Sequence, residues 1–95
     1  MKVLVSRIEL YIPYSSSLKD KRRVIKGLKD KVWAKFRASI SEVDSHDSKQ
    51  QAVLGLVYVS NDSIVLDSMI NKIINLIEDG YPGILHNYEY TVEQY

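Results

Sequence analysis

The sequence predicts an α+β domain in which four antiparallel strands form one sheet and two helices cover one face of that sheet. Three observations carry this prediction. Apolar residues recur with period two in four segments and with helical spacing in two others. These segments follow one another in the order βαββαβ, which is the ferredoxin-like arrangement. Right-handed crossovers then place both helices on the same face. The chain has 95 residues and shows no repeat or linker, so we expect a single domain over residues 1–95.

The first half of the chain predicts a strand followed by a helix. Residues 2–12 alternate between two faces, and Pro13 ends this strand. Ser17, with Asp20 three residues later, is typical of a capping box at a helix start. A helix over about residues 18–37 would direct one apolar stripe to the core, formed by Leu18, Ile25, Leu28, Val32 and Phe36.

The second half predicts three strands and the other helix. Residues 38–44 form a strand in which Ile40 and Val43 cannot both face inward, which predicts a bulge near Ser41–Glu42 or an early strand end. Residues 51–60 are apolar on both faces, as in a central strand. Asn61 or Ser60 would cap the second helix, which ends near residue 80, and residues 84–95 form the last strand. We expect that helix to pack through Ile64, Leu66, Met69, Ile70, Ile73, Ile74 and Ile77.

Composition excludes several classes of protein. The hydrophobic fraction of 45% and charged fraction of 26% are typical of a folded domain and not of a disordered chain. The absence of cysteine excludes disulfides and Cys-ligated zinc. Arg7 and Glu9 interrupt the first apolar run, and the longest uncharged run, residues 50–61, is too short to span a bilayer. We therefore expect a cytoplasmic protein without a membrane partner.

The positive charge of this nearly neutral chain is concentrated in residues 15–37, SSSLKDKRRVIKGLKDKVWAKFR. Nine of the 13 Lys and Arg residues lie there with only two acidic residues, a local net charge of +7. The remainder of the chain has a net charge of −6. Such a dipolar protein can present a cationic surface to a polyanion although its overall charge is +1.

Helical spacing gathers many of these cations into one sector of the first helix, together with the only tryptophan. Cations that follow a phosphate backbone, beside an aromatic ring that stacks on bases, are what RNA contacts require. The alternative is a solvated helix face with the tryptophan packed at the margin of the core. The candidate nucleic-acid-binding residues are Lys19, Arg22, Arg23, Lys26, Trp33 and Arg37.

A second candidate site lies at the start of this helix, where the macrodipole disfavours cations. Four cations nevertheless cluster there, and only Asp20 offsets them locally. An anion held by free backbone N–H groups of Ser15, Ser16 and Ser17 would relieve the repulsion. The cations concerned are Lys19, Lys21, Arg22 and Arg23.

The second hairpin carries Glu42, Asp44, His46 and Asp47, which are possible ligands of a divalent metal. The favoured alternative is polar turn chemistry, in which Asp44 and Asp47 bond their own backbone. The chain has neither the phosphate loop of acylphosphatases nor a Walker loop or Gly-rich dinucleotide turn. We therefore expect no metal, no cofactor and no enzymatic activity.

The uncovered face of the sheet predicts a different kind of contact. The third strand lacks an RNP1 pattern, and acidic residues on the sheet would repel phosphate, so RNA is not expected there. Val3, Val5 and Tyr11 would lie on this face and favour pairing with a second copy, which predicts a homodimer. A regulatory protein–protein module that assembles through this face, with the basic helix on an acidic partner, is the alternative to an RNA-binding protein.

Several short motifs occur in a fixed order, namely Leu10-x-Ile12-Pro13, Ser17-Leu18-Lys19-Asp20-Lys21-Arg22-Arg23, Ser41-Glu42-Val43-Asp44 with Asp47, Leu54-Gly55 and Val59-Ser60. Over about residues 3–79 they resemble the YlxP-like family of small bacterial proteins. This resemblance implies a ferredoxin-like fold, and the frequent position of the family's genes beside those for translation initiation and ribosome maturation implies a role connected with the ribosome. The family often has His-Gln-Asp-Leu-Trp-Gln-Arg in the second hairpin, whereas this chain has SHDSKQQ at residues 45–51.

Overall fold

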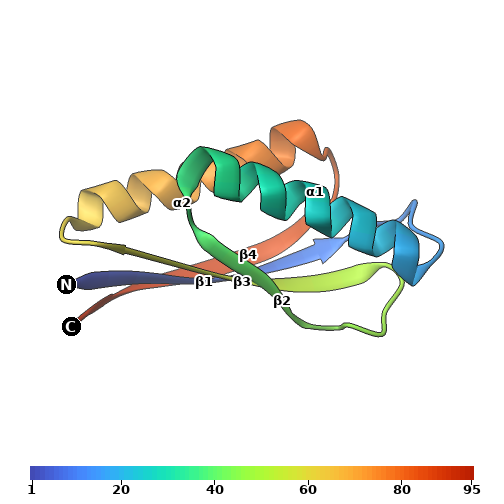
Figure 1. Cartoon of the computed structure of the whole chain (residues 1–95), viewed down its shortest axis with the longest axis horizontal. Coiled ribbons are helices and arrows are strands. Elements are labelled where there is room, and N and C mark those ends of the chain that lie inside the picture. Colours follow the sequence, from blue (N-terminus) through green and yellow to red (C-terminus); the bar gives the residue numbers. More distant parts are fainter.

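The computed structural model describes residues 1–95 and has the predicted order of elements. Four antiparallel strands form one sheet in the order β2-β3-β1-β4, and both helices lie on the same face of it (Figure 1). The ferredoxin-like prediction is therefore confirmed. The elements are β1 (Lys2–Tyr11), α1 (Leu18–Phe36), β2 (Ser39–Asp44), β3 (Gln51–Ser60), α2 (Ser63–Gly80) and β4 (Leu85–Gln94).

The core lies between the sheet and the helices. Strand β1 directs Leu4, Ile8 and Leu10 toward the helices, and β3 adds Leu54 and Leu56 from the neighbouring strand. Each fully buried Leu or Ile side chain stabilises the fold by roughly 1.5–3 kcal/mol. The helices add Ile25, Leu28, Val32, Leu66, Ile70, Ile73, Ile74 and Ile77 to the core.

Neither helix is long and apolar enough to cross a membrane.

The helix caps agree with the prediction at α1 and differ at α2. The hydroxyl of Ser17 accepts a hydrogen bond from the Asp20 N–H at 3.0 Å, as the sequence predicts. The N-cap of α2 is Asp62, whose Oδ1 accepts from the Ile64 N–H at 2.9 Å. Ser60 is still part of β3, and its hydroxyl binds the Asp62 N–H at 3.1 Å. The predicted cap at Asn61 or Ser60 was therefore wrong, because the chain needs two more residues to leave the sheet. Ile64, predicted for the core, is exposed in the first turn.

Strand β2 contains an irregularity in its pairing with β3 between Glu42 and Asp44. Ile40 packs against the core, whereas Val43 lies over Gly55 on the uncovered face of the sheet. A Cβ atom on Gly55 would lie 3.0 Å from a methyl carbon of Val43, so the absence of a side chain lets the bulge pack closely. The predicted bulge is present, slightly later in the chain than expected, and Glu42 points toward α1.

Candidate nucleic-acid interface

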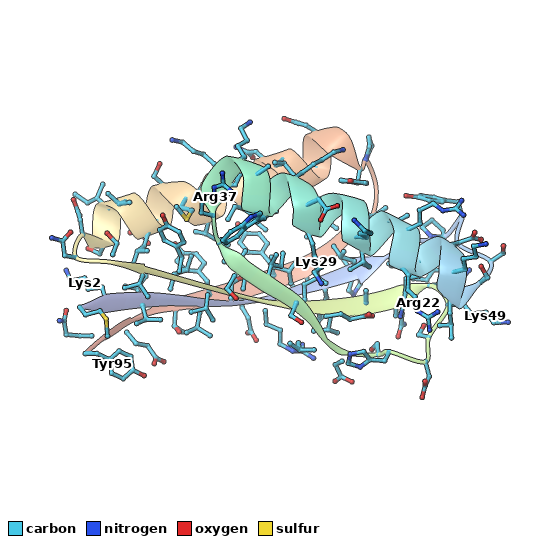
Figure 2. The ribbon with its side chains drawn as sticks, in the orientation of Figure 1. Lys2, Arg22, Lys29, Arg37, Lys49 and Tyr95 are labelled. Atoms are coloured by element: carbon cyan, nitrogen blue, oxygen red, sulfur yellow. The ribbon has the colours of Figure 1, made fainter.

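The candidate RNA-binding residues lie along one side of α1. Positions 19, 22, 26, 29, 33 and 37 follow one another at intervals of three or four residues, so they share one face of the helix over about 27 Å. Figure 2 shows Arg22, Lys29 and Arg37 distributed along α1 in this direction. Arg23 is exposed next to this row. We call the row the cationic stripe; it comprises Lys19, Arg22, Lys26, Lys29, Trp33 and Arg37.

Trp33 lies at the surface within this stripe, and 53% of the residue is exposed. The guanidinium carbon of Arg37 lies 5.2 Å from the centre of its ring, within the range of a cation–π contact. Arg37 reaches this position because it ends the helix with a left-handed backbone, φ 57°, and donates its N–H to the Trp33 carbonyl at 2.9 Å. Trp33 thus does not pack at the margin of the core, which was the alternative considered from the sequence.

A groove beside Trp33 separates α1 from β2. It has a volume of about 290 Å³. Its lining combines residues of α1, of the connection after it and of the start of β2: Lys29, Asp30, Trp33, Ala38, Ser39 and Ile40. The cationic stripe therefore borders a hollow surface and not only a convex helix.

One member of the stripe is paired within the helix. Lys26 Nζ donates to Asp30 Oδ2 at 2.8 Å, one turn further along. This hydrogen bond, together with the charge of Asp30, raises the pKa of Lys26 above its usual value of 10.5. The pair is exposed, so the ammonium group of Lys26 stays accessible to a ligand, and its charge partly offsets the negative charge of Asp30. The other cations of the stripe and Arg23 form no ion pair, because the three ion pairs of the protein are Arg7–Glu9, Lys21–Glu42 and Lys26–Asp30.

Lys21 differs from the cations around it because its side chain is buried, with 1% exposed. Its ammonium group donates to the carbonyl oxygens of Ser45 at 2.8 Å, Gln51 at 3.1 Å and His46 at 3.4 Å. It also lies 2.9 Å from Glu42 Oε2. Lys21 therefore belongs to the fold, which corrects its place among the surface cations at the helix start. Lys21 lies three residues after Leu18 and four before Ile25, on the apolar stripe of the helix, and this spacing in the sequence could have indicated that Lys21 is buried.

The contacts of Lys21 hold the β2–β3 loop, residues 45–50, against the first turns of α1. Lys49 of this loop is exposed. Figure 2 shows Lys49 at the same end of the molecule as Arg22, beyond the start of the helix. Helical spacing cannot relate a loop residue to the stripe, so the sequence did not indicate that Lys49 lies at the same end of the molecule as Arg22.

The turn before α1 uses several of its donors internally. Asp20 Oδ2 accepts hydrogen bonds from the Ser16 hydroxyl at 2.9 Å and the Ser16 N–H at 3.2 Å. These two bonds are the main reason why the pKa of Asp20 lies below its usual value of 3.8. Ser15 is buried, and its hydroxyl donates to the Ser17 carbonyl at 3.1 Å. The anion site predicted at Ser15, Ser16 and Ser17 stays a prediction, and these contacts do not favour it, because the carboxylate of Asp20 already binds the Ser16 donors.

The acidic residues of the second hairpin point in different directions. Glu42 faces Lys21, whereas Asp44 Oδ1 accepts from the Ser45 N–H at 2.7 Å, which is the turn chemistry considered from the sequence. His46 Nε2 lies 3.2 Å from the Glu42 carbonyl. No three His, Asp or Glu side chains of the chain converge on a position that could hold a metal ion.

Residues 3–90 match the family described as "Protein of unknown function (DUF503)". The chain belongs to this family. A relative, "Uncharacterized protein YlxP" of Bacillus subtilis (strain 168), is 33% identical over 76 residues, which cover 80% of this chain and 82% of that protein. The resemblance to YlxP-like proteins is thus confirmed.

Two solved structures resemble this DUF503 member in fold. The de novo designed protein Foldit4 superposes with a TM-score of 0.58 at 14% identity, covering 100% of this chain and 99% of the other. A designed protein with a ferredoxin fold, LFR1 1, superposes with a TM-score of 0.50 at 17% identity, covering 100% of this chain and 87% of the other. At these identities the likeness concerns the fold alone.

Proposed function

We propose that this protein is a non-enzymatic accessory factor that binds structured RNA, in the first instance ribosomal RNA, through the cationic stripe of α1. The observation that supports the proposal most directly is the exposed Trp33, whose ring makes a cation–π contact with Arg37 in line with cations that form no ion pair. Phosphate contacts from Lys and Arg supply most of the affinity for nucleic acids, and aromatic rings supply stacking.

The needs of the fold do not account for the cations of the stripe. The core uses a single lysine of α1, Lys21, and the helix pairs one more, Lys26. Lys19, Arg22 and Arg23 form no ion pair. Lys19 lies in the first turn of α1, at the positive end of the helix dipole, where a cation destabilises the helix by about 0.3–1 kcal/mol at low salt. A phosphate backbone placed along the stripe would convert this repulsion into binding energy.

The choice of ribosomal RNA comes from the resemblance to YlxP-like proteins, whose genes often lie beside those for ribosome maturation. RNA of this kind offers helices and loops within short distances, so a convex row of cations next to a groove would find both phosphates and exposed bases.

Binding of purified protein to ribosomal RNA at two salt concentrations tests the proposal. We expect binding at low salt that weakens strongly at high salt, because phosphate contacts release counterions. The triple variant Lys19/Arg22/Arg23→Ala should lose most of the affinity. The matched control is Lys31/Lys35/Lys72→Ala, which removes the same charge from positions outside the stripe and should bind nearly as well as the wild type.

Two results would contradict the proposal. One is the absence of detectable binding at low salt. The other is an equal loss of affinity in both triple variants, because it would mean that net charge matters and the stripe does not.

The uncovered sheet face supports a second candidate function, assembly with another copy of the chain. Val5 of β1 and Val57 of β3 lie opposite each other and are 42% and 41% exposed, and Val59 beside them is 53% exposed. Val43 extends this apolar surface toward the β2 edge. A second copy offers the same apolar row, so two faces can pack against each other around a two-fold axis. We propose a homodimer in which the two α1 stripes face outward and stay free.

A further inference from the structure

We propose that the groove between α1 and β2 binds an unpaired nucleobase, so that the RNA recognised by this protein carries a bulged or looped-out nucleotide. This inference rests on the proposed function and adds the class of RNA. The groove is lined by Lys29, Asp30, Trp33, Ala38, Ser39 and Ile40.

The shape and chemistry of the groove fit a flat, mostly apolar group. Ile40 is half-buried against the core and offers an apolar surface fixed by the fold, whereas Ala38 lines the groove but is only 1% exposed and leaves almost no surface for a ligand. The indole of Trp33 borders the groove as an aromatic wall. Ser39 adds a hydroxyl group that can donate or accept a hydrogen bond. Ligand sites of this kind combine apolar walls with a few polar groups.

The charges around the groove separate a base from its phosphates. Lys29 borders the groove, and Arg37 lies over the Trp33 ring, so cations are available for the flanking phosphates. Asp30 also lines the groove, and its carboxylate, whose Oδ2 is paired with Lys26, has no donor to offer a phosphate placed inside. The same carboxylate can accept a hydrogen bond from the exocyclic amino group of a base, as acidic side chains do with cytosine. The base therefore enters the groove and the backbone stays on the cationic stripe.

The base must be unpaired because the groove is one short hollow between a helix and a strand. Bases within an RNA duplex are stacked between their neighbours, and the deep, narrow major groove cannot be read by side chains. Unstacked bases of loops and bulges are splayed out and stack on aromatic rings and arginine planes. Trp33 with Arg37 forms such a pair of stacking groups at the surface.

The experiment compares two RNA hairpins that differ only by one unpaired nucleotide in the stem. Trp33 is the only tryptophan of the chain, so its fluorescence reports directly on stacking at this position. We expect the wild type to bind the bulged hairpin about tenfold more tightly than the paired hairpin, with quenching of the indole by the bulged RNA. Trp33→Ala should bind both hairpins equally, and Trp33→Phe should retain part of the preference. Thermal melting of each variant checks that it is folded.

A second variant distinguishes the contribution of the base from that of the phosphate backbone. Arg22→Ala changes the stripe away from the groove and should weaken both hairpins by the same factor, leaving the preference for the bulge intact. Equal affinity of the wild type for the two hairpins without quenching of Trp33 would overturn this inference and leave the proposed RNA binding standing. If neither hairpin nor ribosomal RNA binds to the protein at low salt, both this inference and the proposed RNA binding are overturned.

Discussion

The ammonium group of Lys21 lies 2.9 Å from Glu42 Oε2 in the interior of the molecule, where the lysine side chain is 1% exposed. Burial of an unpaired charge would be strongly unfavourable. Here the carbonyl oxygens of Ser45 and His46 in the β2–β3 loop and of Gln51 at the start of β3 accept hydrogen bonds from the ammonium group, and Glu42 balances its charge. Glu42 Oε2 is itself buried and accepts no hydrogen bond, so its contact with Lys21 is chiefly Coulombic. The pair joins α1 to the second hairpin.

Replacement of Lys21 by methionine should destabilise the protein by about 3–5 kcal/mol, as measured by urea denaturation. Methionine has about the same volume as the lysine side chain. It leaves Glu42 without a counter-charge and the three carbonyl oxygens that bind Lys21 without a donor. The control is Lys26→Met, since Lys26 forms an equally short ion pair with Asp30 but its side chain is 78% exposed. The free energy of unfolding of Lys26→Met should therefore differ little from that of the wild type. Equal stabilities of the two variants would contradict the structural role of Lys21.

The contribution of Asp20 to stability should depend on pH. The Ser16 hydroxyl and N–H hold the folded pKa of Asp20 below the usual 3.8, so ionised Asp20 is favoured in the folded state. The resulting stabilisation is complete above the unfolded pKa and is lost as the pH falls through the lower, folded pKa. Urea titrations at several pH values should therefore show that Asp20→Asn is less stable than the wild type at neutral pH.

This difference should shrink below about pH 4, because the wild-type carboxyl then also becomes neutral. Ser16→Ala removes the hydroxyl donor and should reduce the pH dependence without abolishing it, because the Ser16 N–H contact remains. A constant difference between wild type and Asp20→Asn across the acid range would show that Asp20 gains nothing from Ser16.

Salt titration of RNA binding should identify which cations touch phosphate. For Arg22→Ala we expect the slope of log affinity against log salt to become shallower by about one, because one phosphate contact is lost. Lys35→Ala, on the opposite side of α1, should keep the wild-type slope. An unchanged slope in Arg22→Ala would place the bound backbone away from this part of the stripe.

An aspartate on the uncovered sheet face should dissociate the proposed homodimer. Val57→Asp introduces two opposed carboxylates at the centre of the interface, and sedimentation equilibrium should show a shift from dimer to monomer. Val65→Asp is the matched control, since Val65 is 45% exposed on α2 and Val57 is 41% exposed on the sheet. This control should remain dimeric. A wild type that is monomeric at high concentration would disprove assembly through this face.

Much of the fold was predictable because its signals are local. Alternation in β1, the spacing of Ile25, Leu28 and Val32, and the Ser17–Asp20 cap each depend on residues that are close in sequence. The cap of α2 was predicted one or two residues too early, at Asn61 or Ser60, since several polar residues in a row can cap a helix. The choice of Asp62 depends on where β3 separates from β1, which is a tertiary property.

The cationic stripe was also visible in the sequence, but the roles of its neighbours were not. Lys19 and Lys21 are both basic residues at the start of the same helix, yet one is exposed and the other is buried. Their difference arises from the β2–β3 loop, which lies more than 20 residues further along and brings its carbonyl oxygens to Lys21.

By itself, the sequence determined the order of elements, the core stripe of α1 and the cationic face, because these follow from periodicity and charge along a continuous segment. Only the tertiary structure decided that Lys21 is part of the interior, that Trp33 is exposed beside Arg37, and that β2 completes a groove next to the stripe. The physical reason is that burial and pairing depend on which distant segments approach each side chain. Helical spacing places a residue on a face, and the packing of other elements determines whether that face meets water.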